Sequence, residues 1–258
     1  MKLLHLSDLH LRSAPDALQN IRLRACIDRL LAEHADADLC LITGDLAEEP
    51  TEPTYHILRN EISRLPFRTH LLLGNHDCRD AAFTTLPQLA RDPHGFAQAL
   101  VVTPAGPLIL LDTLDERRHG GLLCPRRLDW LAETLATLRG TGVMVALHHA
   151  PFATGLAGMD AYGLDPEAAA TLSRLLCDHG AVRHLFFGHY HRLIHGQWQG
   201  IPYSCLPSFA EQVALRQPDP VDVAMTPGPA HFAVVTISEG LTLIHSEALA
   251  DPGVLSSP

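Results

Sequence analysis

Short apolar runs alternate with amphipathic stretches along most of the chain, and this alternation limits the fold more than any other feature. The apolar runs predict buried strands at residues 3–6, 39–42, 69–73, 143–147 and 185–187. The amphipathic stretches predict helices at residues 17–34, 53–65, 125–138 and 167–179, with a further one near 81–90. Strands that alternate with helices in this way predict an α/β fold.

The local patterns add detail to these elements. We expect the helix at 17–34 to bury an approximate apolar stripe made of Leu18, Ile21, Ala25, Leu30 and Leu31. The expected helix at 167–179 is followed by Gly180. Many helices end at a residue in the left-handed conformation, and this residue is usually glycine. Residues 96–102 and 108–111 predict a hairpin. Further strands are expected at residues 194–198, 203–206, 231–237 and 241–245.

Two segments lack either pattern. The stretch 207–229 contains five prolines and few apolar runs, so we expect an extended loop there. The stretch 155–163 begins and ends with glycine and is expected to be flexible. Loops on a rigid scaffold often carry the contacts of a binding site, so both segments are expected to shape the rim of a site.

Composition excludes several classes of protein. The formal charge of −10, from 29 acids and 19 bases, disfavours binding to a nucleic acid polymer. No apolar run approaches the roughly 20 residues of a membrane span, and the first residues lack the pattern of an export signal. The six cysteines are scattered singly, as free thiols of a reducing compartment would be. We therefore expect a cytoplasmic protein that does not bind membranes.

Polar side chains directly follow each of the five expected buried strands, which are those at 3–6, 39–42, 69–73, 143–147 and 185–187. The groups are Asp8-x-His10, Gly44-Asp45, Gly74-Asn75-His76-Asp77, His148-His149 and Gly188-His189-x-His191. Because ligands gather at the carboxyl ends of strands in an α/β sheet, these five groups are expected to converge. The three glycines let the backbone turn where a side chain would obstruct it.

Each group taken alone has an ordinary structural explanation. Asp8 can cap a turn, most Gly-Asp pairs such as Gly44-Asp45 are turns, and Asn and Asp after Gly74 also favour turns. The pair His148-His149 can be one buried and one exposed histidine. All five groups in order, each after a strand, favour a single site over five coincidences.

Together the five groups resemble the signature of the calcineurin-like metallophosphoesterases, over residues 2–208. Within this family the chain resembles the class III cyclic nucleotide phosphodiesterases and the related bacterial glycerophosphodiesterases. Finer details, among them Met159-Asp160 and Gln212-Val213, resemble the glycerophosphodiesterases more. The resemblance implies a four-layer αββα sandwich of two mixed sheets flanked by helices. It implies a catalytic domain at residues 1–206, with residues 207–258 as a loop or cap segment and closing strands of the same domain.

The resemblance also implies two metal ions. One would be held by Asp8, His10, Asp45 and His191, and the other by Asp45, Asn75, His148 and His189, with Asp45 as the bridge. Nitrogen and oxygen donors without thiolate favour divalent or mixed-valence Mn, Fe, Zn or Co. His76 is implied as the catalytic group that donates to a phosphate oxygen or the leaving alkoxide. His149 is expected beside the ligands, and Asp77 is expected to orient an imidazole.

The implied activity is hydrolysis of small phosphodiesters by metal-activated hydroxide. A glycerophosphodiester is slightly favoured over a 3′,5′-cyclic nucleotide, and a phosphomonoesterase or a non-catalytic metal-binding scaffold is the alternative. Arg12, Tyr190 and His195 are candidates to contact the substrate, although each is equally well explained as a surface or packing residue. A homo-oligomer with 207–229 as a contact is compatible with the sequence.

Overall fold

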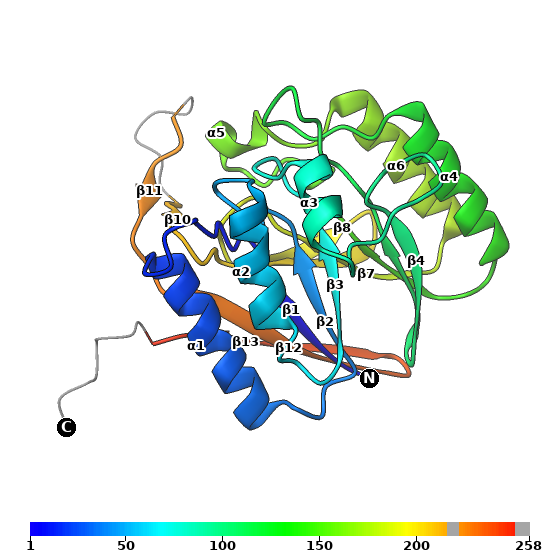
Figure 1. Cartoon of the computed structure of the whole chain (residues 1–258). Helices are drawn as coiled ribbons and strands as arrows, with labels where there is room; N and C mark the ends of the chain where they lie inside the picture. Colours follow the sequence, from blue (N-terminus) through cyan, green and yellow to red (C-terminus); the bar gives the residue numbers. More distant parts are fainter. Residues whose placement is uncertain (216–221, 251–258) are drawn as a thin grey trace.

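The computed structural model describes residues 1–215 and 222–250, and its centre is a pair of sheets packed face to face (Figure 1). The first sheet has the strand order β13-β12-β1-β2-β3. Its strands are β1 (Lys2–Leu6), β2 (Leu39–Thr43), β3 (Arg68–Leu72), β12 (His231–Ser238) and β13 (Leu241–Ala248). The strands β1, β2 and β3 are parallel, whereas β12 pairs antiparallel with both β1 and β13.

The second sheet has the strand order β4-β5-β6-β7-β9-β8. Its strands are β4 (Ala99–Thr103), β5 (Gly106–Leu110), β6 (Val143–Ala146), β7 (Val182–Phe187), β8 (Ile194–Trp198) and β9 (Ile201–Cys205). The four inner strands are parallel and the two edge strands are antiparallel to their neighbours. A small ribbon pairs β10 (Gln212–Val213) with β11 (Met225–Thr226).

Helices cover the outer face of each sheet, as Figure 1 shows. On the first sheet lie α1 (Leu18–Glu33), α2 (Glu52–Ile62) and α3 (Arg79–Thr85). On the second sheet lie α4 (Pro125–Thr137) and α6 (Pro166–His179), while the short α5 (Ala157–Asp160) belongs to the loop after β6. Within the described residues, no helix combines the length and the apolar character that crossing a membrane requires.

The side-chain alternation of the strands explains the four layers. On β2, Cys40 and Ile42 pack against the helices, while Leu39 and Leu41 face the second sheet. A strand that is buried on both faces needs a continuous apolar run, which is the pattern that the sequence shows. The predicted αββα sandwich is confirmed. The division of the chain at residue 206 stays a prediction.

The inward face of α1 differs from the expected stripe. Leu18 is 48% exposed, and the buried apolar side chains are Leu23, Cys26, Ile27 and Leu30. Arg22 also lies on the buried face, because its guanidinium donates to the carbonyls of Phe209, Ala210 and Gly228. A charged side chain that is hydrogen-bonded in this way can be buried, and the hydrophobic pattern cannot reveal this.

Other predicted elements differ mainly at their ends. The helix expected near 81–90 is the shorter α3, and the segment 155–163 contains α5. The stretch 207–229 contains the β10–β11 ribbon, and its residues 216–221 lie outside the described residues. The helix α6 begins after Asp165, whose side chain accepts two backbone N–H bonds, and ends at Gly180 with φ 71° as expected.

Two histidines lie buried around Phe186, which belongs to the core between the sheets. Burial, followed by the nearby His184, lowers the pKa of His5 from 6.5 to about 3. Burial lowers the pKa of His184 to about 4. Both stay neutral in the fold, whereas the unfolded chain takes up protons below pH 6.5. These two groups therefore do not reduce the free energy of unfolding above that pH, and they reduce it progressively as the pH falls from 6.5 toward 4.

We expect His184→Gln to reduce this loss of stability in acid. The wild-type free energy of unfolding should fall by about 1.4 kcal/mol per pH unit for each buried neutral histidine, and the variant has one fewer. Urea unfolding of metal-free protein at several pH values between 6.5 and 4.5 measures the slope. The exposed His195→Gln is the control. Equal slopes in His184→Gln and the wild type would contradict the assignment.

Candidate metal centre

The five groups predicted at the strand ends converge at one place. The strands that carry them are β1, β2 and β3 of the first sheet and β6 and β7 of the second. Each contributes one or two of the seven expected ligands, which are Asp8, His10, Asp45, Asn75, His148, His189 and His191. Of these, all except Asn75 are buried. Parallel strands place their carboxyl ends at one edge, so the two sheets together bring these side chains into contact.

The first donor group consists of Asp8, His10, Asp45 and His191, whose ligand atoms all lie within 4.8 Å of one another. His10 Nε2 is 2.9 Å from His191 Nε2 and 3.5 Å from Asp45 Oδ2. His191 Nε2 is 3.6 Å from Asp8 Oδ1. Two imidazoles and two carboxylates thus face a common point.

The second donor group combines Asn75, His148 and His189 with the same Asp45. The side-chain oxygen of Asn75 lies 2.9 Å from His189 Nδ1 and 3.3 Å from His148 Nε2. His148 Nε2 is also 3.3 Å from Asp45 Oδ2. Since the same Asp45 oxygen faces His10, the Asp45 carboxylate lies between the two groups, where the bridging ligand was expected.

The hydrogen bonds at the outer ring nitrogens orient three of the imidazoles. His148 Nδ1 donates to the carbonyl of Thr43 at 2.7 Å, and His191 Nδ1 donates to the carbonyl of Glu211 at 2.8 Å. His10 Nδ1 lies 2.8 Å from the carboxylate of Glu48. With a proton on each Nδ1, every Nε2 presents its lone pair to the centre, which is the tautomer that a metal ligand requires.

This arrangement fits bound cations. The lone pairs of His10 and His191 face each other at 2.9 Å, which is favourable only with a positive charge between or beside them. Burial alone would raise the pKa of Asp45, but the imidazoles of His148 and His10 outweigh burial and hold it well below its usual range. Burial opposes a charge on His148, yet Asp45 and Asp8 raise its pKa to about 9. The carboxylates therefore favour positive charge at this point.

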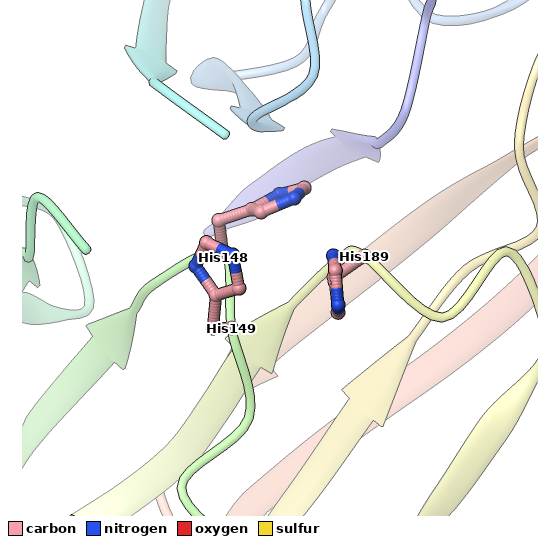
Figure 2. Close-up of side chains that lie close together, drawn as sticks. All are labelled: His148, His149 and His189. Carbon is pink, nitrogen blue, oxygen red and sulfur yellow. The ribbon is translucent and has the colours of Figure 1, made fainter. Parts of the chain in front are cut away.

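His149 is the neighbour of the second donor group rather than a member. Figure 2 shows His148, His149 and His189 close together, and one ring nitrogen of each lies within 4.8 Å of those of the other two. However, His149 Nδ1 lies 2.9 Å from the Thr113 hydroxyl and Nε2 donates to the carbonyl of His119 at 3.0 Å. Burial, with His148, lowers its pKa to about 3. Both ring nitrogens are engaged, so the geometry supports His148 as the ligand.

The backbone of the donor loops has an unusual conformation. Five of the seven expected ligands have left-handed φ values between 46° and 72°, and they are Asp8, His10, Asp45, His189 and His191. Residues other than glycine rarely adopt this backbone conformation, and residues strained in this way are concentrated at functional sites. Hydrogen bonds from Asp8 N to the Gly44 carbonyl and from His10 N to the Asp45 carbonyl hold two of these loops together.

Close packing requires glycine at the positions predicted for sharp turns. A Cβ added to Gly44, where φ is 96°, would lie 2.5 Å from His148 Nδ1. A Cβ at Gly74 would overlap the Asp45 carboxylate, and one at Gly188 would overlap the Ser7 hydroxyl. The absence of a side chain at these positions lets the five loops approach one another.

Glu48 is a residue of the site that the sequence patterns did not reveal. Its Oε2 lies 2.8 Å from His10 Nδ1 and 3.2 Å from His76 Nδ1. These two hydrogen bonds hold the pKa of Glu48 well below its usual range, so the side chain is ionised. The only available signal was its place three residues after Asp45, in the loop that follows β2. Glu48 therefore orients both an expected ligand and the expected catalytic histidine.

The expectation that Asp77 orients an imidazole is wrong. Its carboxylate accepts hydrogen bonds from the backbone N–H groups of Leu46, Ala47 and Gly74 and from the Tyr55 hydroxyl. These donors occupy the side chain completely. Asp77 thus fastens the loop after β2 to the loop after β3, and it places Asp45 and Asn75 only indirectly.

The three candidates for substrate contact lie in different surroundings. Arg12 is exposed and lies 3.7 Å from Glu48 and 3.6 Å from Glu49, at the edge of the site. Tyr190 is completely buried, and His195 lies on β8 in a separate cleft between β8 and β13. Tyr190 is thus a packing residue, and His195 does not reach the donor groups.

A pocket of about 210 Å³ opens directly above both donor groups. It is lined by Asp45, Asn75, His76, His119, Met159, Tyr162, His189, His191, Val213, Val223 and Met225. Its rim includes α5 and the β10–β11 ribbon, which belong to the two segments expected to shape it. A ligand in this pocket would contact the donor groups and His76 together.

Comparison with known proteins establishes the class. The calcineurin-like phosphoesterase family matches residues 1–193 of the chain. The chain therefore belongs to the calcineurin-like phosphoesterases. The family resemblance and the expectation of a hydrolytic enzyme are confirmed.

Three known proteins are similar to the chain over most of its length. A probable cyclic nucleotide phosphodiesterase of Rhodopseudomonas palustris is 34% identical, and the match covers 100% of this chain and 96% of the relative. The glycerophosphodiester phosphodiesterase GpdQ of Enterobacter lignolyticus is 28% identical, over 83% of this chain and 79% of the relative. A dimetal phosphatase structure from Danio rerio has the same fold, with a TM-score of 0.74, 13% identity and 96% coverage of both chains.

We expect Glu48→Gln to weaken metal binding by roughly 10- to 100-fold, because removal of the charge lowers the basicity of His10. Competition with a chelator measures the dissociation constants of Mn²⁺ and Zn²⁺. Glu49→Gln is the matched control, since the neighbouring Glu49 bonds Ser13 and Arg12 instead of a ligand. Equal affinities in the two variants would show that Glu48 does not support the metal centre.

Proposed function

We propose that the chain hydrolyses small phosphodiesters with two metal ions, and that 3′,5′-cyclic nucleotides are its first candidate substrates. The observation that carries the proposal is a pair of donor groups that share Asp45 at the floor of a pocket. The relative that matches the whole chain is named a probable cyclic nucleotide phosphodiesterase, which supports this order of substrates. A glycerophosphodiester, favoured by the sequence patterns, is the second candidate.

The donor atoms indicate how the ions would be held. Asp8, His10 and His191 would hold one ion, Asn75, His148 and His189 would hold the other, and Asp45 would contact both. Nitrogen and oxygen donors of this kind suit Mn, Fe, Zn or Co. Two such cations, when bound, make water acidic enough to supply hydroxide near neutral pH and offset the negative charge of the phosphate.

His76 is placed to act on the phosphate or the leaving group. It lines the pocket and its side chain is 32% exposed, while Nδ1 is held by Glu48. The hydrogen bond to Glu48 raises the pKa of His76 to about 9. The imidazole therefore carries a proton at neutral pH, and Nε2 can donate it to a phosphate oxygen or to the leaving alkoxide.

Further properties stay predictions of the sequence: a cytoplasmic location, a homo-oligomer, and no nucleic acid polymer or membrane as partner. The alternative activities are a phosphomonoesterase with the same donor groups and a scaffold that binds metal without catalysis. One experiment separates them. Metal-loaded protein is assayed on bis(p-nitrophenyl) phosphate and on p-nitrophenyl phosphate, with and without a chelator. A faster monoester reaction supports the phosphomonoesterase, and no reaction on either supports the scaffold.

We expect Asp45→Ala to lose both metal ions and all measurable hydrolysis, because one carboxylate serves both donor groups. Metal content by mass spectrometry and turnover on the diester measure the two effects. Asp80→Ala, an exposed acid of α3, is the control. Wild-type turnover and metal content in Asp45→Ala would refute the bridging role.

We expect His76→Ala to lower kcat by roughly 10²- to 10⁴-fold on a diester with an alkyl leaving group. The loss should be smaller with p-nitrophenolate, because a stable leaving anion needs no proton. Steady-state kinetics on the two substrates measure the difference. Full activity on the alkyl diester would remove His76 from the mechanism, and equal losses on both would assign it to the phosphate oxygen alone.

A further inference from the structure

One wall of the pocket above the donor groups is apolar. Met159 of α5 and the nearby Tyr162 form one part, and Val213, Val223 and Met225 form the other. His119 lies edge-on to the Tyr162 ring, with 6.1 Å between the ring centres and an angle of 89°. The wall thus joins the loop after β6 to the β10–β11 ribbon, directly beside the expected ligands.

Two of the side chains in this wall are fixed by packing in the core, and two others are partly exposed. Met159 and Val213 are 9% and 1% exposed and belong to the core of the second sheet. Tyr162 and Met225 are 43% and 42% exposed, so their side chains remain available to a ligand. The two parts are in contact, since a Cβ added to Gly158 would lie 2.7 Å from the Asp222 carbonyl.

The charges around the pocket discriminate between substrate classes. Among the described residues that line it, Asp45 is the only acid and no lysine or arginine occurs. A cationic amine, such as the ethanolamine headgroup of some glycerophosphodiesters, would find no free carboxylate among these residues, because Asp45 lies between the donor groups. A flat heterocycle would find a phenol ring and two thioethers, which pack favourably against aromatic faces.

We propose that this wall binds the heterocyclic base of the substrate, which makes the substrate a nucleoside 3′,5′-cyclic phosphate. Tyr162 and Met225 are then the residues that determine specificity. The inference rests on the proposed function, and it adds the part of the substrate that does not react. The donor groups would hold the cations that bind the phosphate, while the wall holds the base.

The test compares two cyclic phosphates that differ only in the base. They are adenosine 3′,5′-cyclic phosphate and methyl riboside 3′,5′-cyclic phosphate, assayed on metal-loaded protein. We expect Tyr162→Ala to lower kcat/KM for the nucleotide about tenfold, through KM, because stacking of a base on an aromatic ring contributes about this much. The methyl riboside should be unaffected. Tyr162→Phe should keep wild-type values, since the ring remains.

Met225→Ala should also raise the KM for the nucleotide, by a few-fold, because it removes apolar contact. Leu241→Ala is its matched control: Leu241 is 50% exposed on β13 and does not line this pocket. Equal effects of Tyr162→Ala on both cyclic phosphates, or no effect on either, would overturn the inference and leave the proposed function intact.

Binding of adenosine gives a readout without turnover. Adenosine lacks the phosphate, so its dissociation constant, measured by calorimetry, reports on the wall alone. We expect the wild type to bind it about tenfold more tightly than Tyr162→Ala does. Equal binding would again overturn the inference. Adenosine binding that depends on Tyr162, without hydrolysis of any diester, would support the wall and refute the proposed function.

Discussion

The buried carboxylate of Asp45 is the constraint on which the centre depends. It lies between two sets of imidazoles, with one oxygen 3.5 Å from His10 and 3.3 Å from His148. Its other oxygen accepts the backbone N–H of His76 at 2.9 Å. A charge with so little contact with water is stable only with such compensation. The left-handed backbone of the donor loops, the glycines and the close approach of the two sheets all serve to bring that compensation within reach.

The partners of the imidazoles show how the scaffold fixes the donors. Backbone carbonyls of Thr43 and Glu211 hold the outer nitrogens of His148 and His191, so a peptide group and not a mobile side chain sets each ring. Thr43 is the last residue of β2, and it pairs with Leu72 of the neighbouring strand β3 in the first sheet. The orientation of a donor on the second sheet therefore depends on the position of a strand in the first.

The α/β fold and a shared site at the strand ends were predictable from the sequence because both follow from regular periodicities. Strands buried on both faces need continuous apolar runs, and their carboxyl ends meet at one edge, so the polar groups after these runs were expected to converge. The four layers and the division of the ligands between two ions were implied only by the resemblance to the family. The prediction of the inward face of α1 was wrong because Arg22 is buried through hydrogen bonds to residues nearly 200 positions away. The partners of Asp77 and the role of Glu48 also depend on how separate loops pack, which no local pattern records.

Glu48 contacts two residues that were expected to have separate roles, one in metal binding and one in proton donation. One carboxylate oxygen holds the outer nitrogen of His10, an expected ligand, and that of His76, the expected proton donor. The rings of His10 and His76 are also in edge contact, with 4.7 Å between their centres. Any displacement of Glu48 would therefore move both rings, so the position of the proton donor is tied to that of the donor group. By contrast, the apolar wall is formed by the loop after β6 and the β10–β11 ribbon, and neither of these segments carries the shared carboxylate.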